Sequence, residues 1–248
     1  MTGAIAVTDD GAVRIIRMNR PEKKNALTLA MYTEMTGALR EADQSNAIHC
    51  IMFAGAPGAF CAGNDIGDFL KAAEGGRNLQ AFEFLKAIAL GQKPMVAAVA
   101  GIAIGIGTTM LLHCDHVVAS ADAMLSTPFS RLGLIPEAAS TLLAPRRMGY
   151  ARAFALLIMG RPLSADEAKA AGLVNTVVDA AEVDAVALQA AQEIAALPQG
   201  ALAVARRLMR GDRDAVLKQM EAESRHYADL LKSDEARAAF QAFLARKK

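Results

Sequence analysis

Apolar residues along the first half of the chain recur with two periods, which predicts strands that alternate with helices. The expected strands, short and rich in small or β-branched residues, are 4–8, 12–18, 49–54, 95–100 and 116–119. The expected helices are 28–42, 66–73 and 79–90, followed by an apolar helix that ends near His113. Thr28 suits the cap of the first helix, and Asp10-Gly11 marks the turn of an opening hairpin. This order argues for an α/β fold with mostly parallel pairing.

The second half of the chain has a different pattern. Beyond about Ser140 it is expected to be nearly all helical, with one strand at 173–178. The helix-only tail over residues 182–248 suggests a segment that docks on the core or joins subunits. No repeat or low-complexity linker separates the two parts, so we expect them to share one core.

Composition and charge exclude several classes of protein. The chain has 248 residues, of which 53% are hydrophobic and 21% charged, as in a globular protein and unlike a disordered one. A net charge of +1 gives no field that would attract nucleic acid or an anionic membrane. The arginine pairs at 146–147 and 206–207 lack interleaved aromatic residues, so they indicate solvated helix faces rather than an RNA-binding patch.

Cysteine usage and hydropathy bear on location. Cys50, Cys61 and Cys114 lie within apolar runs, which suggests reduced, buried thiols in a reducing compartment. The N-terminus lacks the pattern of a signal peptide. The longest apolar run, residues 95–106, is interrupted by glycine and is shorter than the roughly 20 residues that a membrane span needs. We therefore expect a cytoplasmic protein that does not enter a membrane.

Two glycine-rich loops, residues 59–65 and 105–109, each connect a predicted strand to the start of a helix. A helix N-terminus presents unpaired backbone N–H groups, and the helix dipole favours negative charge there. Two such ends that converge on one point would form an oxyanion hole. Alternatively, the two loops only turn the chain and allow close packing.

Other site types fit the sequence poorly. The spacing of Gly101, Gly105 and Gly107 matches neither a dinucleotide fingerprint nor a phosphate-binding loop, and the chain lacks the Gly-x-Ser-x-Gly elbow of serine hydrolases. The run from His113 to His116 offers three ligand types, but side chains so close in sequence cannot easily converge on one ion. We expect a packed helix terminus there and no metal site.

One carboxylate stands in apolar surroundings. Glu137 follows Pro136, is expected to open a helix, and has apolar neighbours on both sides. Desolvation raises the pKa of such a carboxyl, which suits it to general-base catalysis near neutral pH. Alternatively, Glu137 is an ordinary first-turn glutamate stabilised by the helix dipole.

These stretches together resemble the crotonase (enoyl-CoA hydratase/isomerase) superfamily. The residues that carry the resemblance are 19–27, 58–66, 100–115, 160–175 and 233–243. They cover nearly the whole chain in the family's order and spacing, so the resemblance is specific. It favours an oxyanion hole over simple turns, and a catalytic over a merely structural glutamate.

The resemblance implies a fold and an assembly. The family's fold is an α/β spiral of ββα units, similar to that of ClpP, with C-terminal helices that pack into trimers. Residues 1–195 would form this core, and residues 196–248 a helical region that packs on the core and on neighbouring subunits. We therefore expect a homotrimer, or a hexamer made of two trimers.

The resemblance also implies a site for an acyl-CoA thioester. By position, the backbone N–H groups of Asn64 and Ile106 would form the oxyanion hole. Many relatives have glycine at the second position, but isoleucine keeps the donor if its φ and ψ suit a side chain. Phe240, from this or a neighbouring subunit, could contact the adenine end. The residues implied to line the CoA channel are Lys24, Ala26, Leu27, Ala62, Gly63, Asp65 and Ile66.

The acids that are present point to one branch of the family. Hydratases of the family use two glutamates, and Thr109 and Phe129 hold those positions here. Glu137 instead resembles the single base of the 3,2-enoyl-CoA isomerases. We therefore expect the protein to move a double bond from the 3 to the 2 position of an enoyl-CoA. One carboxyl can give and receive the same proton, so neither a metal nor a redox cofactor is implied; CoA is part of the substrate.

Two other functions stay open. A hydratase or another acyl-CoA reaction could use Asp65 or Asp68 as a second acid, although Asp65 is expected rather to cap or pack its loop. A catalytically reduced protein that binds acyl-CoA or RNA is the other alternative, but Glu137 and the near-neutral charge argue against it. The aromatic and aliphatic residues that could shape an acyl pocket, or simply pack in the core, are Phe69, Phe82, Phe84 and Leu85.

Overall fold

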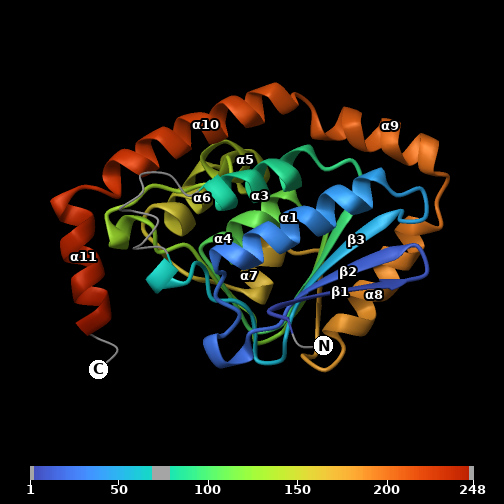
Figure 1. Cartoon of the computed structure of the whole chain (residues 1–248), viewed down its shortest axis with the longest axis horizontal. Coiled ribbons are helices and arrows are strands. Elements are labelled where there is room, and N and C mark those ends of the chain that lie inside the picture. The colour runs from blue at the N-terminus through green and yellow to red at the C-terminus, as the bar shows by residue number, and fades with distance from the viewer. Residues whose placement is uncertain (1–2, 69–78, 246–248) are drawn as a thin grey trace.

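A computed structural model describes residues 3–68 and 79–245 of the chain, with only the backbone described for 243–245. The strands are β1 (Ile5–Asp10), β2 (Val13–Met18), β3 (Cys50–Gly55), β4 (Ala59–Cys61), β5 (Met95–Val99), β6 (Ile102–Ile104), β7 (His116–Ser120), β8 (Met124–Ser126), β9 (Leu163–Ser164) and β10 (Thr176–Val178). The helices are α1 (Leu29–Gln44), α3 (Leu79–Leu90), α4 (Ile106–Thr109), α5 (Ser140–Met148), α6 (Tyr150–Leu157), α7 (Ala165–Ala170), α8 (Val183–Ala195), α9 (Gln199–Arg210), α10 (Arg213–Leu230) and α11 (Asp234–Ala245). The predicted α/β class with mostly parallel pairing is therefore confirmed (Figure 1).

The larger sheet has the strand order β1-β2-β3-β5-β7-β10, and only its opening hairpin β1–β2 is antiparallel. Both faces of this sheet are buried at its centre, as the alternation along β3 shows. Cys50 and Met52 pack in the cluster that contains α8, while Ile51 and Phe53 pack in the main core. Because side chains of a strand alternate between faces, a strand covered on both sides is apolar throughout.

The smaller sheet has the order β4-β6-β8-β9, in which β4, β6 and β8 are parallel. We predicted a loop where β4 lies, and no strand at β6, β8 or β9. Each of these strands has three residues or fewer, too short for a recognisable alternation. Because the three strands are parallel, the segments that leave their carboxyl ends emerge at one edge of the sheet.

Local sequence signals set the first long helix. The Thr28 hydroxyl accepts a hydrogen bond from the Met31 N–H at 3.2 Å, so Thr28 is the predicted N-cap. Met31, Met35 and Leu39 are all buried, as their helical spacing predicted. The bounds of α3 are those predicted, Leu79–Leu90, whereas the helix predicted over 66–73 lies partly outside the described residues.

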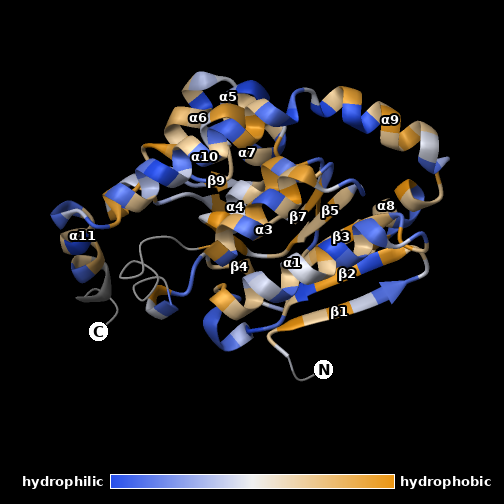
Figure 2. Ribbon diagram, turned by 45° about the horizontal axis from the view of Figure 1, so that its top comes forward, coloured by the Kyte–Doolittle hydropathy of each residue, from blue (hydrophilic) through white to orange (hydrophobic). Residues whose placement is uncertain are grey.

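The C-terminal helices α9, α10 and α11 run as one arc around the rest of the molecule (Figures 1 and 2). Arg206 anchors α9, because its buried guanidinium pairs with Asp115 at 2.9 Å and donates to the carbonyls of Gly91 and Gln92. Helix α10 contacts α3 and α5, and Phe240 of α11 packs in a separate apolar cluster. The arc thus covers one side of the region where the smaller sheet ends.

Two further predictions are corrected and one is confirmed. The strand predicted at 173–178 is only Thr176–Val178, and α5 begins at Ser140 rather than at Glu137. The three cysteines are unpaired and buried, as predicted. Among the described residues, no helix is both long and apolar enough to cross a bilayer.

Candidate active site

A cavity of about 1140 Å³ lies at the carboxyl edge of the smaller sheet. The loops after β4, β6 and β8 contribute to its wall, together with Tyr227 of α10 and Phe240 of α11. The predicted site residues that line it are Lys24, Ala26, Ala62, Gly63, Asn64, Asp65 and Ile66. A cavity of this size with a mixed wall is typical of a small-molecule site.

Leu27 lies behind this wall and holds it in place. Its side chain is buried, its N–H donates to the Gly63 carbonyl at 2.8 Å, and its carbonyl accepts from the Asp65 N–H at 2.8 Å. The loop after β4 is therefore tied on both sides of Asn64. Leu27 positions the predicted oxyanion loop and does not itself line the cavity.

The two predicted oxyanion loops meet because β4 and β6 are neighbours in the sheet. Gly63 and Gly105 have positive φ angles of 90° and 58°, which glycine adopts without strain. A Cβ at Gly105 would lie 4.0 Å from the Gly63 Cα, so the two turns are in contact. A Cβ at Gly107 would lie 2.8 Å from the Cβ of Cys61, so this glycine permits the close packing of α4 on β4.

The predicted donors are available at this junction. Within residues 3–68 and 79–245, the N–H groups of Asn64 and Ile106 donate to no backbone acceptor, whereas the Gly105 N–H donates to the Ser126 carbonyl at 2.8 Å. Ile106 is the first residue of α4, and the positive φ angle falls on Gly105 before it. The backbone at position 106 therefore suits a side chain, and that of Ile106 is buried in the core.

Tyr32 supports the first of these loops, and the sequence analysis missed it. Its O–H donates to the Asn64 Oδ1 at 2.5 Å from a fully buried position on α1, where its ring packs 5.5 Å from that of Phe84. Burial, and after it the charge of Glu137, raises the pKa of Tyr32 well above its ordinary value. The phenol therefore remains a proton donor to Asn64 throughout the neutral range.

Glu137 lies close to Tyr227, one of the residues that line the cavity. Burial raises the pKa of Tyr32, Cys61 and Tyr227, and the charge of Glu137 raises each of them further, which places its carboxyl close to all three. Of these, Tyr227 lines the cavity and Cys61 ends β4. Glu137 itself is not one of the lining residues and is partly accessible, but its Oε1 is buried and has no hydrogen-bond partner among the described residues.

The chemistry of Glu137 follows from these surroundings. Burial, and then the charge of Glu223, raises the pKa of Glu137 to about 8. Burial raises the pKa of Glu223 as well, to about 7, so as the pH falls Glu137 takes up its proton first, and this relieves the repulsion. A carboxylate with a raised pKa and an unpartnered oxygen is suited to accept a proton from a neighbouring atom.

Glu223 is a second carboxylate that the sequence analysis missed. It is 4% exposed, and it accepts hydrogen bonds from the Ala139 N–H at 2.7 Å and from both the N–H and the hydroxyl of Thr141. One signal could have indicated its burial, since Val216, Met220 and Glu223 recur at i, i+4 and i+7 on α10, the spacing of a buried stripe.

The positions of the hydratase glutamates offer no acid. Thr109 is fully buried, and its hydroxyl has no partner in the described part of the chain. Phe129 packs against Phe240 in an apolar cluster. Asp65 accepts a hydrogen bond from Arg20 at 2.8 Å; although burial raises its pKa, this and its other hydrogen bonds hold it below the ordinary value. Asp65 therefore packs its loop as an ionised group, as predicted.

Several other candidates lie elsewhere. Phe82, Phe84 and Leu85 belong to α3 and its packing against the core, and none of them lines the cavity; Phe69 lies outside the described residues. In the 113–116 run, the side chains diverge, since the His113 Nε2 contacts the Ala138 carbonyl and Asp115 pairs with arginines.

Comparison with known proteins adds to this geometry. The enoyl-CoA hydratase/isomerase family model matches residues 8–248. Enoyl-CoA delta isomerase 2 of Rattus norvegicus is 37% identical over 212 residues, which are 83% of this chain but only 54% of the rat protein, so the chain spans about half of that relative. The 1,2-epoxyphenylacetyl-CoA isomerase of Escherichia coli K12 is 32% identical over 95% of this chain and 93% of its own length.

A solved structure agrees over the whole chain. The crystal structure of an enoyl-CoA hydratase/isomerase from Pseudoalteromonas atlantica matches with a TM-score of 0.92 and 36% identity, and the match covers 98% of each chain. The names of these relatives include isomerases of two kinds and a hydratase/isomerase. They agree on a family and a fold, but not on one reaction.

Proposed function

Because the chain belongs to the enoyl-CoA hydratase/isomerase family and has its crotonase fold, we propose that it is a 3,2-enoyl-CoA isomerase. The observation that carries the proposal is that the described part of the chain offers one available base at the site. Glu137 has a buried, unpartnered oxygen and a raised pKa, whereas Thr109 and Phe129 stand where a hydratase has its two acids. Double-bond migration needs one group that removes and returns a proton, and the site offers one.

The geometry of the two loops supports the following reaction. The thioester oxygen accepts hydrogen bonds from the N–H groups of Asn64 and Ile106, which have no other backbone partner in the described part of the chain. Glu137 takes a proton from the α carbon, and the negative charge moves to that oxygen. In enzymes generally, one such donor contributes about 3 kcal/mol to the transition state, or 10²–10³ in rate. Glu137 then returns the proton at the γ carbon, which forms the 2,3 double bond.

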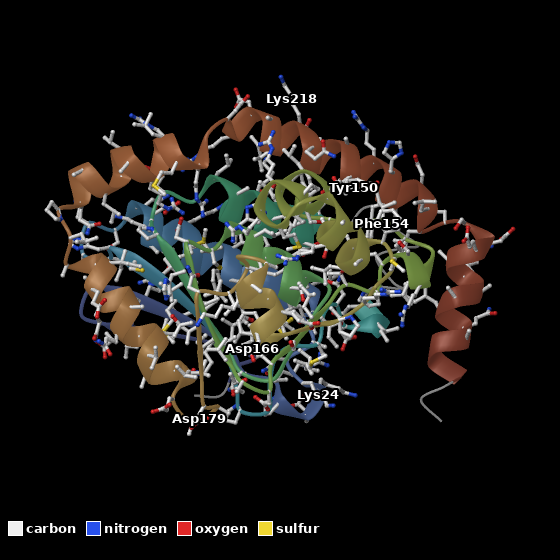
Figure 3. All side chains as sticks on the ribbon, turned by 180° about the vertical axis from the view of Figure 1, so that it is seen from behind. Lys24, Tyr150, Phe154, Asp166, Asp179 and Lys218 are labelled. Atoms are coloured by element: carbon white, nitrogen blue, oxygen red, sulfur yellow. The ribbon has the colours of Figure 1, made fainter. Side chains whose placement is uncertain are left out.

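The CoA part of the substrate suits the outer wall of the cavity. Lys23, Lys24 and Arg131 line it, and all three are exposed, so they can meet phosphates in solvent; Figure 3 shows Lys24 at the surface. We propose that the adenine end lies between these cations and Phe240, which reaches the cavity from α11 of the same chain. No cofactor takes part in this scheme, because CoA belongs to the substrate.

We also propose that the chain assembles into the trimer, or pair of trimers, that the family resemblance implies. Large apolar side chains are exposed on two helices, and each set is compatible with contact to a second copy. On α9, Leu208 is 73% and Met209 87% exposed. On α6, Tyr150 is 73% exposed beside Phe154, with the ring centroids 5.9 Å apart (Figure 3).

The test of the reaction is the variant Glu137→Gln with a 3-enoyl-CoA substrate. We expect the conjugated absorbance of the 2-enoyl product to appear with the wild-type chain and not with Glu137→Gln, because the amide cannot accept the proton. Calorimetric binding of acyl-CoA should persist in the variant. Glu221→Gln, an exposed change on α10, is the control and should turn over normally. Near-normal turnover by Glu137→Gln would contradict the proposal.

A second assay separates the hydratase alternative. Glu223 is a second buried carboxylate near Glu137, and two carboxylates are what hydration requires. However, hydrogen bonds from Ala139 and Thr141 occupy both of its oxygens, so it is not free to handle a proton. Incubation with a 2-enoyl-CoA should therefore leave its conjugated absorbance unchanged. Loss of that absorbance, with 3-hydroxyacyl-CoA appearing, would favour the hydratase.

A further inference from the structure

Glu137 is followed by a backbone turn that is unusual for its sequence. Ala138 and Ala139 have φ angles of 65° and 53°, in the left-handed region. This conformation is disfavoured for a residue with a Cβ, so two such residues in succession persist only where the surroundings fix them. The direction of the Glu137 carboxyl therefore depends on whatever holds residues 138 and 139.

Two buried side chains hold this turn, one from a residue before it in the sequence and one from a residue after it. The His113 Nε2 lies 2.8 Å from the Ala138 carbonyl, and the Glu223 Oε2 accepts from the Ala139 N–H at 2.7 Å. Burial, and then the nearby arginines, lowers the pKa of His113 to about 4, so the ring is neutral at working pH and its Nε2–H is the donor. The contact with His113 thus brings no positive charge to the turn.

Glu223 also completes the start of α5. Ala139, the cap residue of that helix, has no side chain that can cap it, and the Glu223 Oε1 accepts from the N–H and the hydroxyl of Thr141 instead. The Gln219 side chain donates to the same hydroxyl at 2.8 Å, so Thr141 is itself fixed from α10. A carboxylate at a helix start is well solvated by backbone N–H groups. Burial nevertheless outweighs these hydrogen bonds and raises the pKa of Glu223 to about 7, so Glu223 is largely ionised near pH 8, where Glu137 titrates.

The groups that face Glu137 come from three elements. α1 contributes Tyr32, β4 contributes Cys61, and α10 contributes Tyr227 together with Glu223, four residues apart on one helix face. The first three are neutral near pH 7 because burial raises their pKa values. The charge that acts on Glu137 is thus that of Glu223, and no cation in the described part of the chain offsets it.

We propose that Glu223 is a positioning residue, which fixes the turn at residues 138–139 and so aims the Glu137 carboxyl, and whose carboxylate repels that of Glu137. The proposal rests on Glu137 being the base of the proposed reaction. Glu223 does not touch the substrate, since its oxygens are occupied by Ala139 and Thr141. It acts through Glu137, by backbone geometry and by repulsion between like charges.

The first test compares Glu223→Gln with Glu221→Gln, which carries the same change at an exposed position on the same helix. The base must be deprotonated, so kcat/KM rises with pH through the pKa of Glu137. Without the neighbouring charge, we expect this rise to move to lower pH by about one unit in Glu223→Gln, with a lower plateau. Glu221→Gln should keep the wild-type profile. Identical profiles in all three proteins would overturn the proposal.

A second measurement does not depend on the reaction. The side-chain carboxyl resonance of Glu137 can be assigned in ¹³C-glutamate-labelled protein as the one that Glu137→Gln lacks. Its titration midpoint should fall in Glu223→Gln and stay unchanged in Glu221→Gln. This midpoint tests the proposed repulsion between Glu223 and Glu137 even if the chain turns over no 3-enoyl-CoA. An unchanged midpoint in Glu223→Gln would refute that repulsion.

Glu223→Asp separates geometry from charge and serves if Glu223→Gln does not fold. The shorter carboxylate keeps the charge but cannot reach the Ala139 N–H and Thr141 together. We therefore expect the pH at which activity rises to stay near that of the wild type while kcat falls about tenfold at similar KM. A wild-type kcat in a folded Glu223→Asp would show that the turn needs no support from this residue, and the proposal would fail.

Discussion

Replacing Glu137 by glutamine should stabilise the folded chain at alkaline pH while it removes activity. The ionised carboxylate is desolvated and faces Glu223, so the folded state favours the protonated form. The pKa rises from 4.5 in the unfolded chain to about 8 in the folded one. Between these values the folded state holds a proton that the unfolded state has released, so stability falls as the pH rises.

The size of the effect follows from that difference. A shift of about 3.5 units corresponds to about 5 kcal/mol lost above pH 8, since each unit is worth about 1.4 kcal/mol. Glutamine removes this loss but leaves a buried carboxamide without a partner, which costs about 1–3 kcal/mol. We therefore expect Glu137→Gln to raise the free energy of unfolding by about 2–4 kcal/mol at pH 9. At pH 5 the gain should vanish or reverse, because the wild-type carboxyl is then protonated in the fold.

The assay is urea unfolding at pH 5, 7 and 9, followed by far-UV circular dichroism because the chain has no tryptophan, at one fixed protein concentration. Glu221→Gln on the exposed side of α10 is the control, and its effect should stay within about 0.5 kcal/mol at each pH. If Glu137→Gln raises the free energy of unfolding no more at pH 9 than at pH 5, the reasoning is refuted. That result would mean that ionisation of Glu137 does not destabilise the folded state.

Two further predictions concern residues that support the site and the fold. Tyr32→Phe removes the hydroxyl that donates to the Asn64 Oδ1 at 2.5 Å. We expect kcat to fall about tenfold, which corresponds to about 1.4 kcal/mol, and the melting temperature to fall by only about 2–4 °C. A wild-type kcat would exclude this role. Arg206→Met removes one of the two arginines that pair with Asp115 and the donor to the Gly91 and Gln92 carbonyls. We therefore expect urea unfolding to show a loss of about 1–3 kcal/mol, with normal kcat per folded molecule. A loss below about 0.5 kcal/mol would show that Arg206 does not anchor α9.

The secondary structure that could be predicted is that which repeats a local pattern. The ends of α3 were placed without error, and Thr28 caps α1, because helix spacing and capping depend on residues a few positions apart. The ends of the strands of the larger sheet were located to within two residues, except for β10, which begins three residues after its predicted start. The smaller sheet was missed almost entirely, because strands of two or three residues owe their conformation to pairing with distant segments rather than to their own sequence.

The residues of the site also divide into those that the local sequence predicts and those that depend on the fold. The sequence by itself determined the two loops that carry Asn64 and Ile106, and the isolated Glu137 after Pro136, because glycine and proline constrain the backbone wherever they occur. The sequence did not reveal that Leu27 lies behind the cavity wall and does not line it. Its place depends on backbone pairing with Asn64, which is distant in the sequence.

Only the tertiary structure decided what surrounds Glu137. The pKa of a carboxyl depends on the water that it loses and on the charges near it, and both come from segments far away in the chain. Tyr32 approaches from more than a hundred residues before Glu137, and Glu223 from more than eighty after it. In the sequence, Glu223 is one of several acidic residues of α10; it becomes the neighbour of the base because that helix packs across the start of α5.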